Sequence, residues 1–391
     1  MPKFSADYIF PVSSPPVKNG TVVMDENGVI TEVSDSQHAE AEIYKGIICP
    51  GFVNTHCHLE LSYLKGEIPE KTGMNGFIKN LLSKRSGFSD QKIREAIIRG
   101  EKEMINNGIV AVGDISNNES SFLQKAKQNL LYHTFIEIFD LDSAYAEEVF
   151  TNGTLLENKL GEVFSEKSSK PHSSIVPHAP YTVSEKLLYK IETHALKNNA
   201  VLTIHNQESE GENDLFINKT GALAEMMNQM NIPVKATGYN SLRSTLVHLP
   251  KGSKILLVHN TYTSAEDIRW AHSYSNCIYW CFCPNANLFI ENKLPDFNSF
   301  IKENAKITIG TDSLASNKNL SVLEELKTIS KYSPDISLEI LLLWATRNGA
   351  EFLGFEAEKG SIEKGKTPGL NLITGMNGVA LTADSTVKKL V

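Results

Sequence analysis

Eight short apolar runs alternate with helical patterns along most of the chain, and this alternation restricts the fold more than any other feature of the sequence. The first run lies at residues 46–50, and the others lie at 109–113, 131–139, 174–176, 200–204, 254–258, 277–281 and 306–309. Helical stretches such as 91–107 and 184–198 separate most of the runs, as parallel pairing through crossover connections requires. Eight such units predict an α/β fold of the (β/α)8 TIM-type barrel class.

The first apolar run predicts a buried strand that leads directly to the segment GFVNTHCHLE at residues 51–60. In an extended chain, residues two apart point to the same side, so His56 and His58 can present their imidazoles to one ion while Cys57 faces away. A His-x-His pair alone is weak evidence for a metal, because histidines also occur in sheets as hydrogen-bonded polar residues. The interpretation therefore depends on the residues at the ends of the other strands.

Polar side chains come directly after three of the later apolar runs. His205 and Glu208 come after the fifth run, His259 after the sixth and Asp312 after the eighth. The carboxyl ends of parallel barrel strands open on one face, so these groups should converge with the first two histidines. Each residue alone could simply cap a helix. Together, they predict a metal site at the mouth of the barrel.

Short β segments flank the barrel region at both ends of the chain. Near the N-terminus, the dipeptide Asn27-Gly28 lies between β-branched runs at 20–24 and 29–33, which is the sequence form of a tight hairpin. Further β segments lie at 360–363, 370–373 and 378–382. We therefore expect a small β-sandwich domain of residues 1–50 and 358–391, with the catalytic barrel domain, residues 51–357, inserted into it.

Composition and charge argue against several classes of partner. The formal net charge is -8 and no tract is rich in Lys or Arg, whereas nucleic-acid binding needs a clustered cationic face. No run of about 18 apolar residues occurs, and the N-terminus lacks an apolar core after a basic start, so we expect no membrane partner and no export. The odd set of five cysteines suits reduced thiols in the cytoplasm. The sequence leaves the oligomeric state open, and a homodimer is compatible with it.

The whole pattern resembles the amidohydrolase superfamily, in particular its metal-dependent aminohydrolases, which include guanine, adenosylhomocysteine and cytosine deaminases. The resemblance covers nearly the entire chain. It implies that the metal ligands are His56, His58, His205 and Asp312. It also implies that Glu208 shuttles protons and that His259 holds the attacking water. Residues 176–178, VPH, lack the Lys that two-metal members use at the fourth strand end, which favours one ion, Zn²⁺ first and Fe²⁺ as the alternative.

The chemistry of these residue types favours deamination. A divalent ion held by neutral imidazoles and one carboxylate lowers the pKa of a bound water toward about 7. Asp312 can take the proton of that water, and Glu208 would protonate a ring nitrogen next to the attacked carbon and later help the amine leave as ammonia. His259 would orient the water and offset its charge. An ester carbonyl would not need the proton donor, whereas a cyclic amidine does.

Substrate contacts are less clearly indicated. The fragment HCHLELS at 56–62 looks like that of aminodeoxyfutalosine deaminases, the menaquinone-pathway members of this branch, although Asn80 stands where their helix has Trp. Glu60 could bind a purine edge or a ribose hydroxyl, or it could cap the next helix. His178 looks like a substrate-contacting histidine of the adenosine-type deaminases. Arg243 could bind a substrate carboxylate or lie on the surface.

The sequence therefore predicts a single-metal aminohydrolase for an aminopurine nucleoside, with aminodeoxyfutalosine as the first candidate substrate. Adenosylhomocysteine, methylthioadenosine, guanine and amino-triazines are the alternatives within the same branch, and a cyclic amidase would share the same superfamily. A non-catalytic barrel scaffold would be expected to lack ligands or the acid, and none of them is missing here.

Overall fold

The computed structural model describes residues 1–165, 167, 170–233 and 236–391. Its centre is formed by eight strands that run parallel in two four-stranded sheets, ordered β6-β7-β8-β9 and β10-β11-β12-β13. These strands are β6 (Phe52–Cys57), β7 (Ile109–Ser116), β8 (Leu131–Ile138), β9 (His172–Pro177), β10 (Leu202–Asn206), β11 (Ile255–His259), β12 (Ile278–Phe282) and β13 (Lys306–Ile309). The α/β barrel class expected from the sequence is confirmed.

The two sheets meet along both of their edges. At one seam, the backbone N–H of His205 on β10 donates to the carbonyl of His178, which comes just after β9 (3.0 Å). At the other seam, Cys57 and Asp312 form an isolated parallel bridge, and the backbone N–H of Thr311 donates to the carbonyl of His56 (3.0 Å). The eight strands thus surround one core, whose largest fully buried side chains include Trp280 and Phe52.

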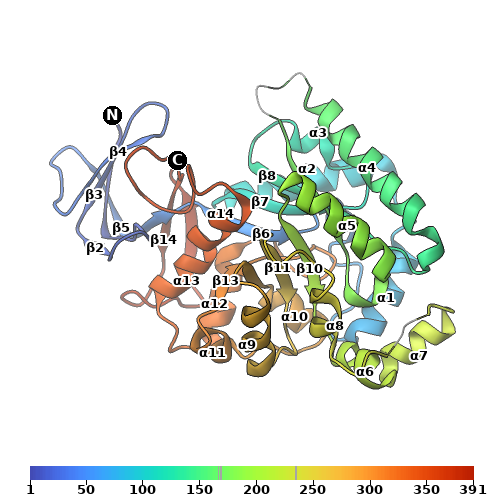
Figure 1. Ribbon diagram of the computed structural model, residues 1–391. Coiled ribbons are helices and arrows are strands. Elements are labelled where there is room, and N and C mark those ends of the chain that lie inside the picture. Colours follow the sequence, from blue (N-terminus) through green and yellow to red (C-terminus); the bar gives the residue numbers. More distant parts are fainter. Residues whose placement is uncertain (166, 168–169, 234–235) are drawn as a thin grey trace.

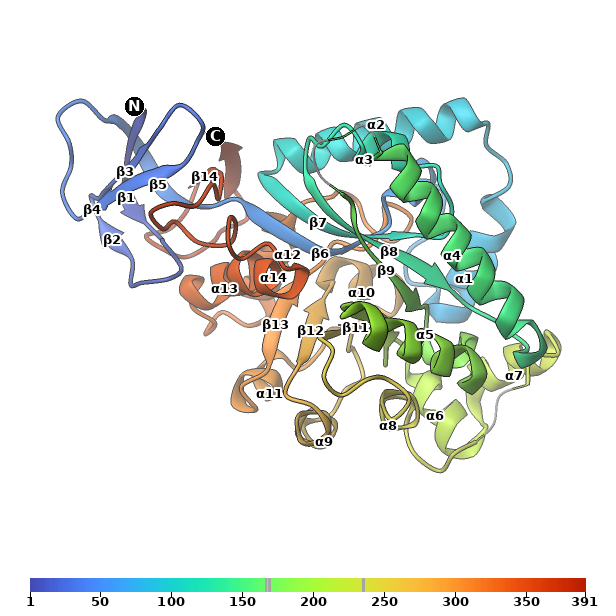
Figure 2. The same ribbon diagram turned by 45° about the horizontal axis from the view of Figure 1, so that its top comes forward.

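Helices cover the outside of the strands, as Figure 1 and Figure 2 show. They are α1 (Gly73–Lys84), α2 (Asp90–Asn106), α3 (Phe122–Lys125), α4 (Ala146–Val163), α5 (Glu185–Asn198), α6 (Glu210–Asn218), α7 (Gly221–Gln229), α8 (Ser241–Leu246), α9 (Ala265–Tyr274), α10 (Pro284–Ile290), α11 (Phe297–Lys302), α12 (Val322–Tyr332), α13 (Leu338–Ala345) and α14 (Arg347–Leu353). Three short 3-10 helices are η1 (Leu59–Leu64), η2 (Ser143–Tyr145) and η3 (Pro180–Thr182). Serine caps begin the long helices α2 and α5, where Ser89 and Ser184 accept hydrogen bonds from the backbone three residues on. None of the helices among the described residues has the length and apolarity needed to cross a membrane.

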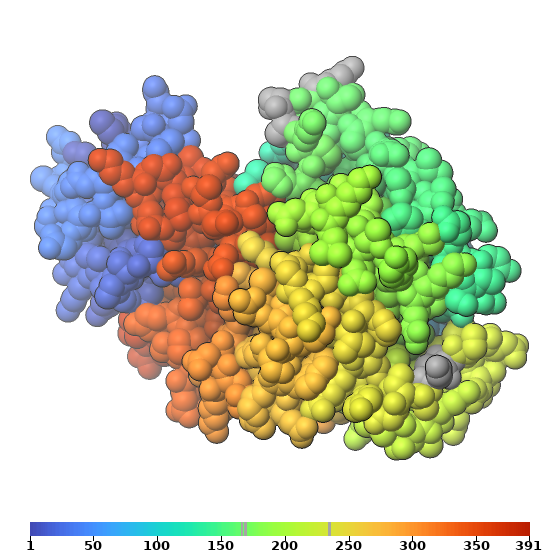
Figure 3. Space-filling view, in the orientation of Figure 1, coloured from blue at the N-terminus to red at the C-terminus, as the bar shows by residue number. Residues whose placement is uncertain are grey.

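Strands from both chain ends form a third sheet, seen at one side of the barrel in Figure 1 and, as adjoining blue and red segments, in Figure 3. Its order is β15-β14-β5-β1-β3-β4, with β2 beside β1. The strands are β1 (Lys3–Ile9), β2 (Val17–Lys18), β3 (Thr21–Met24), β4 (Ile30–Ser34), β5 (Glu42–Pro50), β14 (Leu370–Thr374) and β15 (Thr386–Lys389). The strands of the predicted sandwich are thus linked by hydrogen bonds into one sheet, and the predicted hairpin is the antiparallel pair β3–β4. We propose that this sheet marks the small domain, residues 1–50 and 358–391, beside the barrel domain, residues 51–357.

The prediction that the apolar run at 46–50 is the strand carrying the histidines is wrong. This run belongs to β5, which pairs with β1 and β14 in the terminal sheet, and the histidines lie on and just after a separate strand, β6. Only Gly51 separates the two strands. A Cβ placed there would lie 2.3 Å from Cγ1 of Val110 and 2.8 Å from the carbonyl O of Pro368, so the chain passes between sheets at a point with no room for a side chain. Residues 360–363 and 378–382 lie outside the strands, and β15 closes the sheet instead.

Candidate metal centre and active site

His56 and His58, at the end of the first barrel strand, lie close to Asp312 and point toward the same small space. Nε2 of His56 lies 3.2 Å from Nε2 of His58, and Oδ1 of Asp312 lies 3.6 Å and 3.5 Å from these two nitrogens. His56 is fully buried, and the other two side chains are also buried. His56 and His58 come from the end of β6, and Asp312 lies after β13 across the seam. The geometry therefore brings together residues that the sequence places at the first and last strand ends.

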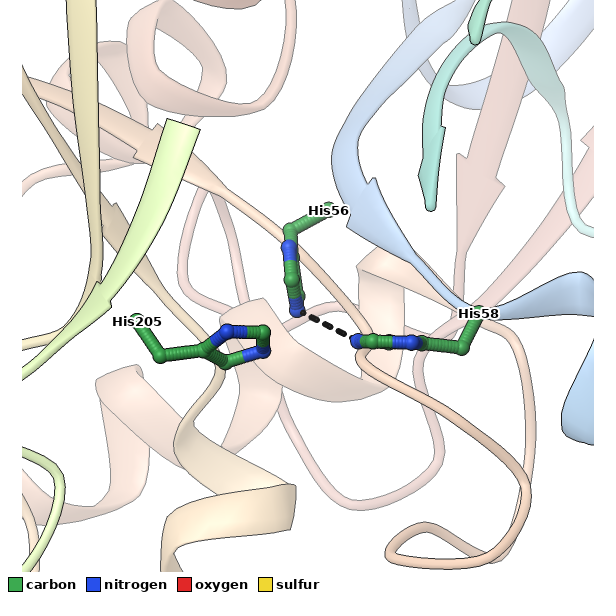
Figure 4. A group of neighbouring side chains, drawn as sticks. All are labelled: His56, His58 and His205. Atoms are coloured by element: carbon green, nitrogen blue, oxygen red, sulfur yellow. Dashed lines mark hydrogen bonds between the residues drawn. The ribbon is translucent and has the colours of Figure 1, made fainter. Parts of the chain in front are cut away.

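His205 completes this group from β10. Its Nδ1 donates a hydrogen bond to the carbonyl of His178 (2.7 Å), because a carbonyl can only accept. Nε2 is then left with a free lone pair, and Figure 4 shows the ring directed toward His56 and His58. Ring nitrogens of these three histidines all lie within 4.8 Å of one another. Burial, followed by the neighbouring imidazoles, holds the pKa of His205 well below its usual range, which keeps the ring neutral.

The backbone at these strand ends is held in an uncommon conformation. Gln207, His259 and Asp312 have φ values of 45°, 73° and 55°, in the left-handed region that non-glycine residues rarely adopt. Asn54 fixes the segment before Asp312, since its side chain donates to Thr311 Oγ1 (2.8 Å) and accepts from Thr311 N (3.0 Å). Such strain is retained where the surrounding contacts over-determine it, which is common at functional sites.

This donor set fits a divalent cation. Three imidazole nitrogens and one carboxylate oxygen are the ligands that zinc and iron accept, and they meet here in a buried space. No Lys or Arg of the described chain pairs with Asp312, whose other oxygen accepts from Ser316 Oγ. Burial alone would raise the pKa of Asp312, but the hydrogen bond with His56 and the adjacent imidazoles hold it well below its usual range. Asp312 is therefore an anionic candidate ligand that has neither Lys nor Arg beside it among the described residues.

Glu208 and His259 lie next to these ligands, on the cavity side. Oε1 of Glu208 is 3.4 Å from Nε2 of His259, and Nδ1 of His259 donates to Oδ1 of Asn287 (2.8 Å). Burial, together with the charge of Asp312, raises the pKa of Glu208 well above its usual range, so the side chain can hold a proton at neutral pH. Burial lowers the pKa of His259 to about 4, so its ring stays neutral. A protonated Glu208 can act as a proton donor, and a neutral His259 beside it can orient a water molecule.

The backbone of Glu208 is held by a second carboxylate. Glu212, in the first turn of α6, accepts hydrogen bonds from the N–H groups of Gln207 (2.9 Å) and Glu208 (3.2 Å). It is 1% exposed, and burial raises its pKa to about 7. The turn that aims Glu208 into the cavity therefore depends on a carboxylate that does not line the cavity itself.

A cavity of about 220 Å³ opens above these residues. Its deep end is lined by His58, His205, Glu208, His259 and Asp312. Its outer part is mostly apolar, and its lining there includes Phe77, Leu81, Phe139, Met226, Met227 and Met230. Helices α1 and α7 supply many of these side chains and meet where Asn75 Nδ2 donates to the carbonyl of Ala222 (2.8 Å). Arg85, just after α1, is the cationic residue of the lining.

The three residues predicted to bind substrate lie in different surroundings. His178 lines the cavity, with Nδ1 2.8 Å from Thr182 Oγ1. Glu60 is outside the lining and is 2% exposed, and it accepts hydrogen bonds from the backbone N–H groups of Asn117 (3.2 Å) and Asn118 (3.3 Å). It thus neither reaches the substrate space nor caps a helix. Burial raises the pKa of Glu60 to about 8.

Arg243 is also outside the cavity lining. Its guanidinium pairs with Glu266 (2.6 Å) and lies 3.8 Å from Asp267, over the ring of Trp270. The expectation that Arg243 binds a substrate carboxylate therefore has no support in the geometry, because the two acidic residues already pair with the guanidinium. Arg85, rather than Arg243, lines the cavity.

The polar cavity residues that were missed in the sequence include Glu137 near the end of β8 and Asn117 after β7. Glu137 and ring nitrogens of His178 and His205 lie within 4.8 Å of one another and form a second group of metal-ligand type. However, Nδ1 of His205, 3.6 Å from Glu137 Oε1, already donates to a carbonyl, so this group is one ligand short. The available signal was a single carboxylate near the end of a mostly buried strand.

Known proteins resemble the chain over most of its length. An adenosine deaminase of Helicobacter pylori is 26% identical over 367 residues, covering 90% of this chain and 86% of its relative. A 5'-deoxyadenosine deaminase of Methanococcus maripaludis is 26% identical, covering 85% of this chain and 76% of the relative.

Solved structures that share the fold include two deaminases. The structure of Helicobacter pylori aminofutalosine deaminase in complex with methylthio-coformycin superimposes with a TM-score of 0.83 at 22% identity, covering 98% of this chain and 94% of the other. An adenosine deaminase from Xanthomonas campestris with bound zinc gives 0.76 at 20% identity, covering 95% and 84%. The model of the amidohydrolase family matches residues 47–389, so the chain belongs to the amidohydrolase family.

Proposed function

We propose that this protein is a hydrolytic deaminase that acts on an aminopurine nucleoside and releases ammonia. The observation that carries this proposal is the position of Glu208, an acid of raised pKa beside His259 at the deep end of the cavity, next to the ligand group. A hydrolase acting on an ester would not need a proton donor for a ring nitrogen. The named deaminase relatives support the same reaction class.

His56, His58, His205 and Asp312 would hold the cation, and we propose a single ion, Zn²⁺ first and Fe²⁺ as the alternative. When bound, such an ion lowers the pKa of a ligated water, which makes a nucleophile available at neutral pH. No lysine stands at the fourth strand end, where β9 ends in Pro177 and is followed by His178. The zinc in the Xanthomonas campestris structure supports this choice of metal.

The side chains of the chain divide the proton transfers between them. Asp312, whose pKa is lowered, is placed to accept a proton from the attacking water. Glu208 holds a proton that it can donate to the ring nitrogen beside the attacked carbon, and it can later pass a proton to the leaving amine. His259 is kept neutral, with Nδ1 engaged by Asn287, so its Nε2 can orient the water.

The outer cavity favours a nucleoside with an apolar arm. Phe77, Phe139 and the methionines of α7 provide an apolar wall, and Arg85 lies at the same cavity. A guanidinium pairs well with a carboxylate. Aminodeoxyfutalosine combines an aminopurine nucleoside with a carboxylated aromatic arm, so we propose it as the first candidate substrate, ahead of adenosylhomocysteine, methylthioadenosine, guanine and amino-triazines. The five free cysteines support a reducing compartment, and we propose the cytoplasm.

An ammonia-release screen tests the proposal. The purified, metal-loaded protein is offered aminodeoxyfutalosine, adenosine, methylthioadenosine, adenosylhomocysteine, guanine, an amino-triazine and a cyclic amide, with Glu208→Gln as the inactive control. We expect ammonia release from at least one aminopurine nucleoside. Hydrolysis of the cyclic amide would open its ring without releasing ammonia, so that substrate is followed by the loss of its ring absorbance, and we expect no change. Activity on the cyclic amide alone would contradict deamination and indicate an amidase.

A further inference from the structure

Glu137 presents a carboxylate oxygen that no described residue of the protein satisfies. The side chain stands at the end of β8, is 5% exposed and lines the cavity. Its Oε2 accepts a hydrogen bond from Asn117 Nδ2 (3.0 Å), whereas Oε1 has no hydrogen-bond partner among the described residues. Oε1 is therefore a buried acceptor with unused capacity, on a side chain that lines the substrate space.

The nearest ring nitrogen does not explain the position of Glu137. Nδ1 of His205 is 3.6 Å from Oε1, too far for a hydrogen bond, and it donates instead to the carbonyl of His178 at 2.7 Å. The orientation of His205 is thus fixed without Glu137. No Lys or Arg of the described chain pairs with this carboxylate. A buried carboxylate oxygen that accepts no hydrogen bond destabilises the fold. The presence of such an oxygen in this cavity therefore points to a hydrogen-bond donor on the bound ligand.

The surrounding contacts hold Glu137 in one position. Asn117 Nδ2 donates both to Oε2 and to the backbone carbonyl of Glu137 (3.0 Å each). The backbone of Asn117 is in turn bound by the buried carboxylate of Glu60. The loop after β7 thus holds the end of β8 in place. Because the carboxylate of Glu137 is already fixed, it loses little conformational freedom when a ligand binds.

The chemistry of an adenosine-type substrate restricts which donor can meet this oxygen. The free ring nitrogens N1, N3 and N7 of a ribosylated adenine only accept hydrogen bonds. The donors are the exocyclic amine, which leaves at the reacting centre beside Glu208, and the hydroxyls of the sugar. A 5'-deoxyadenosine retains only its 2'- and 3'-hydroxyls, so these are the donors common to the substrates named for the relatives.

We propose that Glu137 is a specificity-determining residue that accepts a hydrogen bond from the 2'- or 3'-hydroxyl of an aminopurine ribonucleoside. This inference rests on the proposed deaminase function and defines its substrate class as ribonucleosides rather than free bases or deoxynucleosides. Asn117 is the positioning residue that holds the other oxygen of Glu137 and directs Oε1 to the sugar.

The test compares kcat/KM for adenosine, 2'-deoxyadenosine and 3'-deoxyadenosine. We expect the wild-type enzyme to disfavour at least one deoxy analogue by at least about tenfold, because a hydrogen bond to a charged acceptor is lost. Glu137→Ala should lose most of this discrimination by lowering activity on adenosine selectively. Glu147→Ala, at an exposed position at the start of α4, is the control and should keep the wild-type ratio.

The outcomes separate this inference from the proposed function. Equal wild-type activity on all three nucleosides overturns the role of Glu137 and leaves the deaminase proposal intact. A Glu137→Ala variant that is as selective as the wild type overturns that role as well. Absence of activity on every aminopurine nucleoside overturns both proposals. If Glu137→Ala fails to fold, Glu137→Gln replaces it in the test, because it keeps the size of the side chain. The proposal then requires that Glu137→Gln also discriminates less than the wild type between adenosine and the deoxy analogues, although by a smaller factor.

Discussion

Glu208 and His259 approach each other from neighbouring strands, with Oε1 of the carboxyl 3.4 Å from Nε2 of the imidazole. One comes just after β10 and the other ends β11, and both line the deep end of the cavity. The proposed proton donor and the group proposed to orient the water therefore face the same small volume. Substitutions of Glu208 and of His259 can therefore test proton donation and orientation of the water separately.

Replacing Glu208 by Gln should remove the proton shuttle without removing the metal. Gln keeps the size of the side chain but cannot donate the proton to a ring nitrogen, so kcat should fall by at least about a hundredfold. Steady-state kinetics and elemental analysis measure the two effects. Glu210→Gln, an exposed neighbour in the first turn of α6, should behave like the wild type. Unchanged turnover in Glu208→Gln would overturn the assignment.

Metal analysis of the wild type should find about one equivalent of zinc or iron per chain. His205→Ala removes one of the four ligands, and its preparations should contain much less metal and show little activity. His194→Ala, on the outer helix α5, is the matched control and should retain the full equivalent. Two equivalents in the wild type, or full loading of His205→Ala, would contradict the single four-ligand site.

Glu212 should act as a positioning residue for Glu208. Glu212→Ala leaves two buried N–H groups without an acceptor, whereas Glu212→Gln retains an amide oxygen that can accept from them. We expect kcat to fall by about tenfold or more in the Ala variant and to be largely restored in the Gln variant, with unchanged metal content. Equal losses of kcat in both variants would indicate that the negative charge, rather than the backbone contact, is what matters.

Arg85→Ala should discriminate between substrates by their outer arm. If the guanidinium pairs with a carboxylate there, KM for aminodeoxyfutalosine should rise by about tenfold or more, while KM for the uncharged adenosine should change little. Arg243→Ala is the control, because that guanidinium is engaged by Glu266 outside the cavity. A similar change of KM for both substrates would remove Arg85 from the proposed recognition of an anionic arm.

The buried carboxyl of Glu325 should make stability pH-dependent. It accepts from Asn285 N (2.8 Å) and Asn317 Nδ2 (2.7 Å), and burial nevertheless raises its pKa to about 8. A carboxyl whose pKa is higher in the folded than in the unfolded state stabilises the fold fully below the unfolded pKa, and this contribution is lost as pH rises toward 8.

We therefore expect the free energy of unfolding of the wild type, relative to Glu325→Gln, to decrease by about 1.4 kcal/mol per pH unit between pH 5 and pH 8. Urea unfolding at several pH values measures it. Glu324→Gln removes the partly exposed neighbour, which pairs with Lys327, and should show no such trend. A constant difference between wild type and Glu325→Gln across this range would contradict the prediction.

The strands and the ligand group were predictable because burial and topology determine them together. The runs that became β7 to β13 are largely buried on both faces, as is typical of strands in a parallel barrel, and His205 and Asp312 lie at or just after the ends of their strands. The error at residues 46–50 arose because two strands of different sheets are consecutive in the chain with only Gly51 between them. A run of buried residues does not show where one sheet ends and the next begins.

Side chains whose role depends on a partner far away in the sequence could not be placed. Glu60 binds the loop after β7, and Arg243 binds Glu266, and neither partner has a recognisable spacing in the sequence. The methionines of α7 look like ordinary core residues until the helix is known to lie beside α1. Glu137 lies in a predicted strand, but only the register of β8 shows that it faces the cavity.

The bridge between Cys57 and Asp312 joins the beginning of the barrel to its end, and it has a consequence for biosynthesis. His56 and His58 leave the ribosome long before Asp312 is translated, so a nascent chain carries only part of the proposed ligand set. A chain that terminates before Asp312 lacks the proposed carboxylate ligand. The proposed site is therefore complete only in a polypeptide that extends past β13, the eighth barrel strand.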